Sequence, residues 1–101
     1  MSPVRAPLLL LALFLPALAD AGALPPDVDA FVRDRDACDH FRGEPFEGES
    51  PEQVQRREFI RESVEIYCPG TDRRLAALKR RHRDDPGIMK VLGAYEAKIG
   101  L

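Results

Sequence analysis

One short stretch of the chain, ACDHFRGEPFEG from residue 37 onward, carries thiol, imidazole and carboxylate groups close together. Such groups bind zinc or copper, and a cysteine beside a histidine is also the arrangement of a nucleophile and its base. The chain holds one other histidine, His82. Two kinds of site therefore need to be weighed: a metal centre that uses Cys38, His40 and His82, and a reactive Cys38.

The spacing within this stretch argues against both kinds of site. Two residues that lie two positions apart on a helix point about 200° apart, so Cys38 and His40 share an ion only if the helix ends between them. A cysteine that is oxidised to a disulfide offers no thiolate. We therefore interpret the stretch as the end of a helix, with His40 near the negative end of the helix dipole. We expect no catalytic residues and no cofactor, and the metal site through Cys38, His40 and His82 remains the alternative.

The N-terminus has the order of a secretory signal peptide. Arg5 precedes an apolar run from Leu8 to Leu18, and small residues follow. Cleavage after Ala19 fits best, because a proline lies just upstream, and cleavage after Ala23 also fits the rule. The run of about 11 apolar residues is shorter than the about 20 that a membrane-spanning helix needs. We expect a signal over 1–19, no permanent membrane anchor, and a periplasmic or secreted protein.

The mature chain is long enough for one small domain, which we place at 27–101 after an N-terminal extension over 20–26. Of the 15 basic residues only Arg5 lies in the signal, so 14 remain against 17 acidic ones, a net charge of −3. This balance argues against nucleic-acid binding. The chain has no tryptophan, no run of alternating apolar residues and few β-branched residues, which argues against a sheet and favours an all-α fold.

Cys38 and Cys68 are the two cysteines, and an even count in an exported protein predicts one disulfide. The bridge closes a loop of 30 positions, for which the chain-entropy relation gives about 3.6 kcal/mol of stabilisation. That amount is comparable with what the core of so small a domain supplies.

Start and stop signals divide the mature chain into about four helices. The first covers about 27–42, with an apolar stripe of Val28, Phe31, Cys38 and Phe41, and ends at Gly43. The second covers about 51–67, with Ser50 and Gln53 as a capping box. Its apolar face is formed by Val54, Phe59, Ile60, Val64, Tyr67 and Cys68. The third begins with Thr71 as its cap and ends before Pro86, where Asp85 caps the start of the fourth. The fourth carries apolar residues at helical spacing, and these are Ile88, Val91, Leu92, Tyr95 and Ile99.

The disulfide restricts how the first two helices pack. The second helix is about 25 Å long, and in a simple up-down hairpin its far end, with Cys68, lies well away from Cys38. A bridge needs Cα atoms about 6 Å apart. Either loop 43–50 runs back along the bundle or the two helices cross steeply. We predict a small irregular bundle that is crossed rather than up-down.

A basic cluster dominates the third helix and the turn after it. It is a candidate surface for an acidic partner, and its alternative is a solvated helix face. We expect the partner to be another protein of the cell envelope. The candidate binding residues are Arg73, Arg74, Lys79, Arg80, Arg81 and Arg83.

Several motifs resemble those of a group of small exported proteins of Gram-negative bacteria. They are Cys-Asp-His-Phe-Arg-Gly-Glu at 38–44, Tyr-Cys-x-Gly-Thr-Asp at 67–72, Leu-x-x-Leu-Lys at 75–79, Asp-Asp-Pro at 84–86 and Tyr-Glu at 95–96. This resemblance implies a periplasmic location and a helical fold. The chain is also similar to periplasmic lysozyme inhibitors of the LprI type, in which a Cys precedes a Leu-x-x-Leu helix. The first Cys of that group lies much closer to the second than 30 residues, and no inhibitory residue is carried over.

Overall fold

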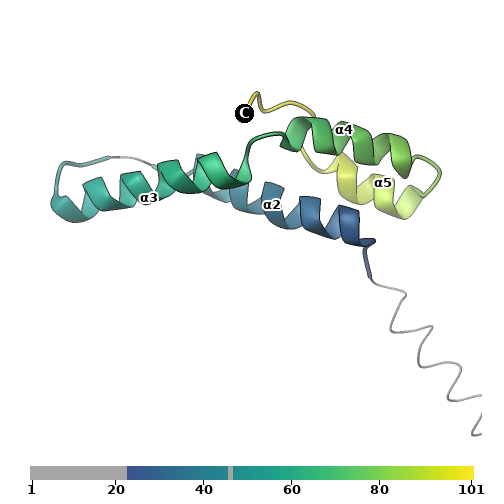
Figure 1. Ribbon diagram of the computed structural model, residues 1–101, viewed down its shortest axis with the longest axis horizontal. Helices are drawn as coiled ribbons and strands as arrows, with labels where there is room; N and C mark the ends of the chain where they lie inside the picture. Colours follow the sequence, from purple (N-terminus) through teal and green to yellow (C-terminus); the bar gives the residue numbers. More distant parts are fainter. Residues whose placement is uncertain (1–22, 46) are drawn as a thin grey trace, which may run out of the picture.

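The protein is described by a computed structural model that covers residues 23–45 and 47–101, so the expected signal peptide over 1–19 lies outside the described residues. The described part is helical and contains no strand, which confirms the all-α prediction (Figure 1). Its helices are α2 (Pro26–Arg42), α3 (Pro51–Tyr67), α4 (Thr71–Arg81) and α5 (Pro86–Gly93).

The predicted start of α3 is confirmed in detail. The Ser50 hydroxyl accepts a hydrogen bond from the backbone N–H of Gln53 (3.2 Å), and the Gln53 side chain accepts one from the N–H of Ser50 (3.1 Å). The two contacts satisfy backbone donors that a helix start otherwise leaves unpaired. At the start of α5, Asp85 accepts from the N–H of Ile88 (3.1 Å), as its position before Pro86 indicates.

Two predicted helix ends are wrong. Thr71 is not a cap: Gly70 holds that position with φ of 78°, a left-handed conformation that favours glycine, and Thr71 is the first helical residue. The Thr71 hydroxyl instead donates to the Cys68 carbonyl (2.9 Å). The last helix ends at Gly93, so Tyr95 and Ile99 lie in a non-helical C-terminal segment over 94–101, which the contacts described below hold in place.

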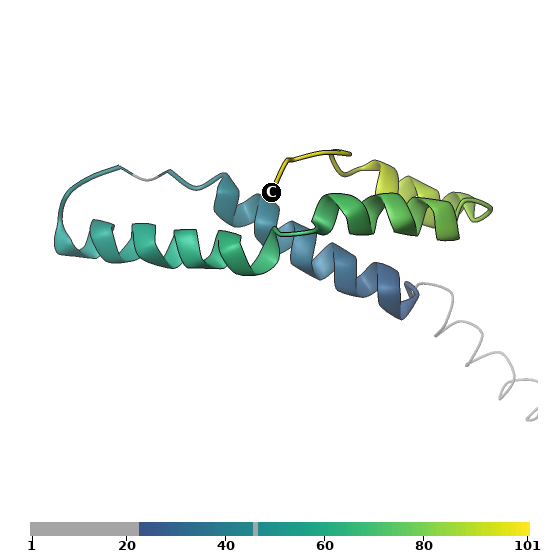
Figure 2. The ribbon, with the colours of Figure 1, turned by 45° about the horizontal axis from the view of Figure 1, so that its top comes forward.

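Helix α2 is the element against which both α3 and α4 pack. The C-terminal part of α2 packs against α3, while α4 packs against the preceding part of α2 and pairs with α5 (Figures 1 and 2). The main core lies at the α4 end of the molecule, where Tyr95 also meets Phe31 edge to face at 5.4 Å. The buried members of this core are Val28, Phe31, Leu75, Leu78 and Leu92.

The disulfide joins Cys38 and Cys68 with their Cα atoms 4.9 Å apart, and both cysteines are fully buried. From α2 the chain runs out to the far end of α3, and α3 then returns to bring Cys68 beside Cys38 (Figure 2). The start of α3 lies beyond the end of α2 (Figure 2), so the connection does not run back along the bundle, which was the first of the two predicted routes. The arrangement is nonetheless irregular rather than an up-down hairpin, as predicted.

The far half of α3 projects beyond α2, so part of its expected apolar face is not covered. Ile60 is buried as expected. Val54 and Phe59, assigned to the same face, are 40% and 57% exposed, and Ile66 is 72% exposed. Periodicity identified the helix correctly but did not show how far its neighbour extends.

The disulfide leads to a prediction for stability. We expect the variant with both Cys38→Ala and Cys68→Ala to lose about 3.6 kcal/mol of unfolding free energy, because the unfolded chain regains the entropy of a 30-position loop. Urea unfolding of the mature protein measures the change, and the reduced wild-type protein serves as the control. A loss below about 1 kcal/mol would show that the bridge does not hold the fold together.

Candidate functional site

The residue that organises this region is Arg35, which the apolar pattern did not identify. Its side chain is fully buried, at 0% exposure, on the inner face of α2. It lies seven positions after Val28 and three before Cys38, so it fills the gap in the predicted apolar stripe. The missing member of an otherwise regular stripe was the signal that could have revealed it.

The buried guanidinium reaches three parts of the chain. It donates to the Glu96 carbonyl of the C-terminal segment (2.6 Å) and to the Thr71 hydroxyl at the start of α4 (3.4 Å). It also lies 3.4 Å from an Asp39 carboxylate oxygen and 3.6 Å from one of Asp72. These contacts satisfy a charge that would be unfavourable to bury alone, and they hold α2, α4 and the C-terminal segment together.

Asp72 fastens the C-terminal segment at a second point. Its carboxylate accepts hydrogen bonds from the backbone N–H groups of Ile99 (2.9 Å) and Gly100 (2.9 Å). The Gly100 and Ile99 contacts, with Arg35 and Lys98 nearby, lower the pKa of Asp72 below its usual value. The C-terminal segment therefore lies against the start of α4, to which these hydrogen bonds attach it, and does not continue helix α5.

Two residues of the predicted basic cluster pair with carboxylates of α2. Arg81 pairs with Asp27 (2.6 Å), and Arg74 pairs with Asp34 (2.8 Å). Arg74 and Arg81 are seven residues apart on α4, and their partners on α2 are also seven residues apart. The earlier arginine pairs with the later aspartate, so the two helices run in opposite directions. The spacing of the two ion pairs therefore matches the antiparallel packing of α4 on α2.

The other four basic residues face solvent or the edge of the domain. Arg73, Arg80 and Arg83 are exposed, and Lys79 is partly exposed. None of the ion pairs between described residues includes any of them. We call these four residues the basic surface.

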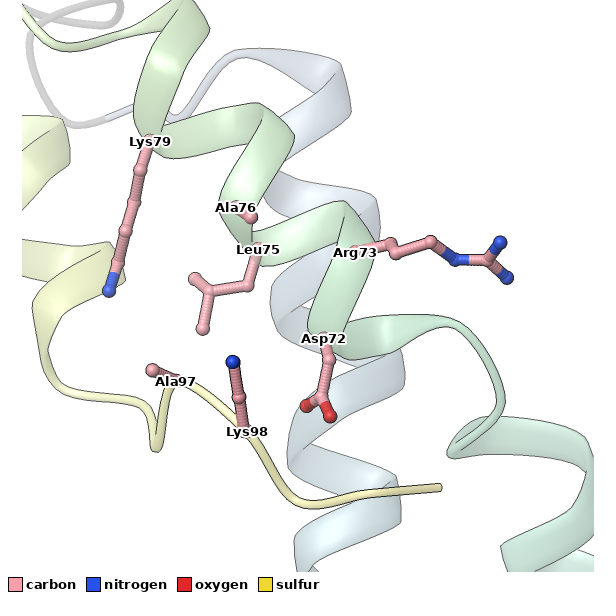
Figure 3. A pocket seen from close by; sticks show the side chains of 7 residues that line it. All are labelled: Asp72, Arg73, Leu75, Ala76, Lys79, Ala97 and Lys98. Atoms are coloured by element: carbon pink, nitrogen blue, oxygen red, sulfur yellow. The ribbon is translucent and has the colours of Figure 1, made fainter.

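A groove lies next to the basic surface, between α4 and the C-terminal segment (Figure 3). Its volume is about 290 Å³. Leu75 and Ala97 point into it, and Lys79 and Lys98 approach it from opposite sides, while Arg73 points away (Figure 3). The lining residues are Asp72, Arg73, Leu75, Ala76, Lys79, Ala97 and Lys98.

The structure does not bring the candidate metal ligands together. Cys38 is bonded to Cys68. His40 pairs with Glu44 (3.3 Å) near the end of α2, whereas His82 pairs with Asp27 (3.1 Å) near its start, about 20 Å away along the helix. Over 23–45 and 47–101, no group of three or more His, Cys, Asp or Glu side chains is placed to hold a metal ion.

Comparisons with known proteins find no match, whether with family models, with curated proteins or with solved structures. Within the part of the chain that the structure describes, no helix has the length and apolar character needed to cross a membrane. The features that define the candidate site are thus the basic surface and the groove beside it.

The role of Arg35 gives a second prediction. We expect Arg35→Met to lower the unfolding free energy by about 3 kcal/mol, because Asp39 and Asp72 lose a buried cation and the C-terminal segment loses an anchor. Arg33→Met on the same helix is the matched control. Its side chain is 79% exposed and pairs only with Asp29 among described residues, so its loss should change stability by at most about 0.5 kcal/mol. Equal effects of the two substitutions in urea unfolding would contradict the role of Arg35.

A third prediction concerns pH and the pair that links α4 to α2. Hydrogen bonds from Arg81 and then His82 lower the pKa of Asp27 from 3.8 to about 2. The ionised form therefore adds stability above pH 3.8, and this contribution is lost as the pH falls through about 2. We expect Asp27→Asn to be less stable than wild type at pH 7 and the difference to shrink between pH 4 and pH 2.

Thermal unfolding across this pH range measures the difference. Asp84→Asn removes an exposed carboxylate that has no ion-pair partner among the described residues, and it serves as the control. A gap between wild type and Asp27→Asn that stays constant from pH 7 to pH 2 would contradict the pairing.

Proposed function

We propose that this is an exported, disulfide-bonded helical protein that binds an acidic region of another envelope protein through its basic surface. The expected signal peptide over 1–19 supports a periplasmic or secreted location. The disulfide is compatible with that location because such bonds persist in oxidising compartments.

The observation that carries the proposal is the division of the basic cluster. Acidic residues outnumber basic ones in this chain, 17 to 15, so carboxylates are plentiful. Arg74 and Arg81 are paired with them, yet Arg73 and Arg80, exposed on the same helix, form no ion pair with any residue that the structure describes. A concentration of unpaired positive charge attracts an acidic partner and orients its approach.

The basic surface is also held rigidly. Helix α4 begins beside the disulfide, and the Arg74 and Arg81 pairs link it to α2. A preformed surface loses less conformational entropy on binding than a mobile one. These features favour recognition of a partner over catalysis.

Charge reversal tests the proposal. We expect Arg73→Glu with Arg80→Glu to reduce the recovery of cross-linked envelope partners at least tenfold, which corresponds to about 1.4 kcal/mol of binding free energy. The measurement is quantitative mass spectrometry after cross-linking in intact cells. The matched control, Arg33→Glu with Lys90→Glu, makes the same charge change on exposed residues outside the basic surface and should retain its partners.

Unfolding curves of both double variants confirm that each is folded at the temperature of the experiment. Recovery of the same partners in the same amounts by wild type and by the Arg73→Glu, Arg80→Glu variant would show that the basic surface is merely solvated.

A further inference from the structure

The groove between α4 and the C-terminal segment combines an apolar floor with cations at its rim. Leu75 is 1% exposed and forms the deepest part, with Ala76 and Ala97 beside it. Lys79 extends from α4 and Lys98 from the C-terminal segment toward the same space (Figure 3). An occupant of this groove therefore meets apolar atoms below and positive charge on two sides.

The two lysines at the rim, Lys79 and Lys98, form no direct ion pair within the described part of the chain, although the ionised carboxylate of Asp72 lies near Lys98. Asp72 is the one carboxylate in the lining, and its oxygens already accept from the N–H groups of Ile99 and Gly100. The Asp72 carboxylate thus binds the C-terminal segment that forms one side of the groove.

The size of the groove limits what it can hold. Its volume of about 290 Å³ lies just below the range of about 300–1,000 Å³ that is usual for sites binding whole small molecules. The α4 residues that line it run from Asp72 to Lys79, a span of about 10 Å along the helix. This length accommodates one large apolar side chain and is shorter than the acyl chain of a membrane lipid.

We propose that the groove receives a single apolar side chain, such as Phe, Leu or Ile, from an acidic segment of the partner protein. The proposal rests on the function proposed above and defines the partner more narrowly. Carboxylates that flank the apolar residue pair with Lys79 and Lys98, and carboxylates farther along the segment reach the adjoining Arg73. The lysines favour the acidic residues of the segment, and the apolar floor favours its apolar side chain, so both features of the groove contribute to binding the same segment.

Selection from a phage library of random dodecapeptides on the mature, oxidised protein tests the proposal. We expect the enriched peptides to carry Phe, Leu or Ile with Asp or Glu on both sides. Enrichment of peptides without this pattern, or no enrichment, would overturn the proposal.

Substitutions in the groove then test where the enriched peptides bind. We expect Lys79→Gln with Lys98→Gln to weaken binding at least tenfold, and Ala76→Leu, which narrows the apolar floor without changing any charge, to weaken it as well. The control, Arg33→Gln with Lys90→Gln, removes two positive charges elsewhere and should change binding less than twofold. Fluorescence anisotropy with labelled peptides measures the affinities.

The same variants separate this proposal from the proposed function. If envelope partners are lost on reversal of Arg73 and Arg80 but are kept by Ala76→Leu and by the Lys79, Lys98 variant, the groove proposal is wrong and the basic surface remains the binding site. A lipid ligand would give a different result: the wild-type protein would bind phosphatidylglycerol vesicles but no peptide, and Lys79→Gln with Lys98→Gln would abolish the vesicle binding. That result would overturn the proposal.

Discussion

A single buried charge, the guanidinium of Arg35, is the constraint on which the arrangement of this domain depends. Removing a cation from water is unfavourable by several kcal/mol unless hydrogen bonds and opposite charges replace the solvent. The planar, multi-donor guanidinium is suited to collect such contacts from several directions. Here they come from α2 itself through Asp39, from the start of α4 through Thr71 and Asp72, and from the C-terminal segment through Glu96. Elements that are distant in sequence converge on this point.

The disulfide acts one turn away on the same helix. Cys38 follows Arg35 by three residues and receives Cys68, the residue that ends α3 just before α4 begins. The covalent bond and the buried charge therefore anchor the same turn from both of its ends. This arrangement has two consequences: the far half of α3 projects without cover, and the C-terminal segment is held across α4 as one wall of the groove.

Local signals predicted the helix starts at Ser50 and Asp85, the disulfide and the crossed arrangement, because each depends on residues near in sequence or on the length of one helix. The features that were missed depend on tertiary contacts. Helix α5 stops at Gly93, and Arg35 and Asp72 bind the backbone of the segment beyond it. Arg74 and Arg81 form ion pairs because Asp34 and Asp27 of α2 lie opposite them. The spacing of basic residues along α4 does not show which of them face a carboxylate of another helix.

The most direct test of this account is NMR observation of the Arg35 guanidinium in the oxidised mature protein. A buried guanidinium that donates to Thr71 and Glu96 predicts Nε and Nη protons that exchange slowly with water at neutral pH and show nuclear Overhauser effects to Thr71 and to residues of the C-terminal segment. Rapid exchange of these protons with water, without contacts to either segment, would contradict the claim that Arg35 holds the domain together.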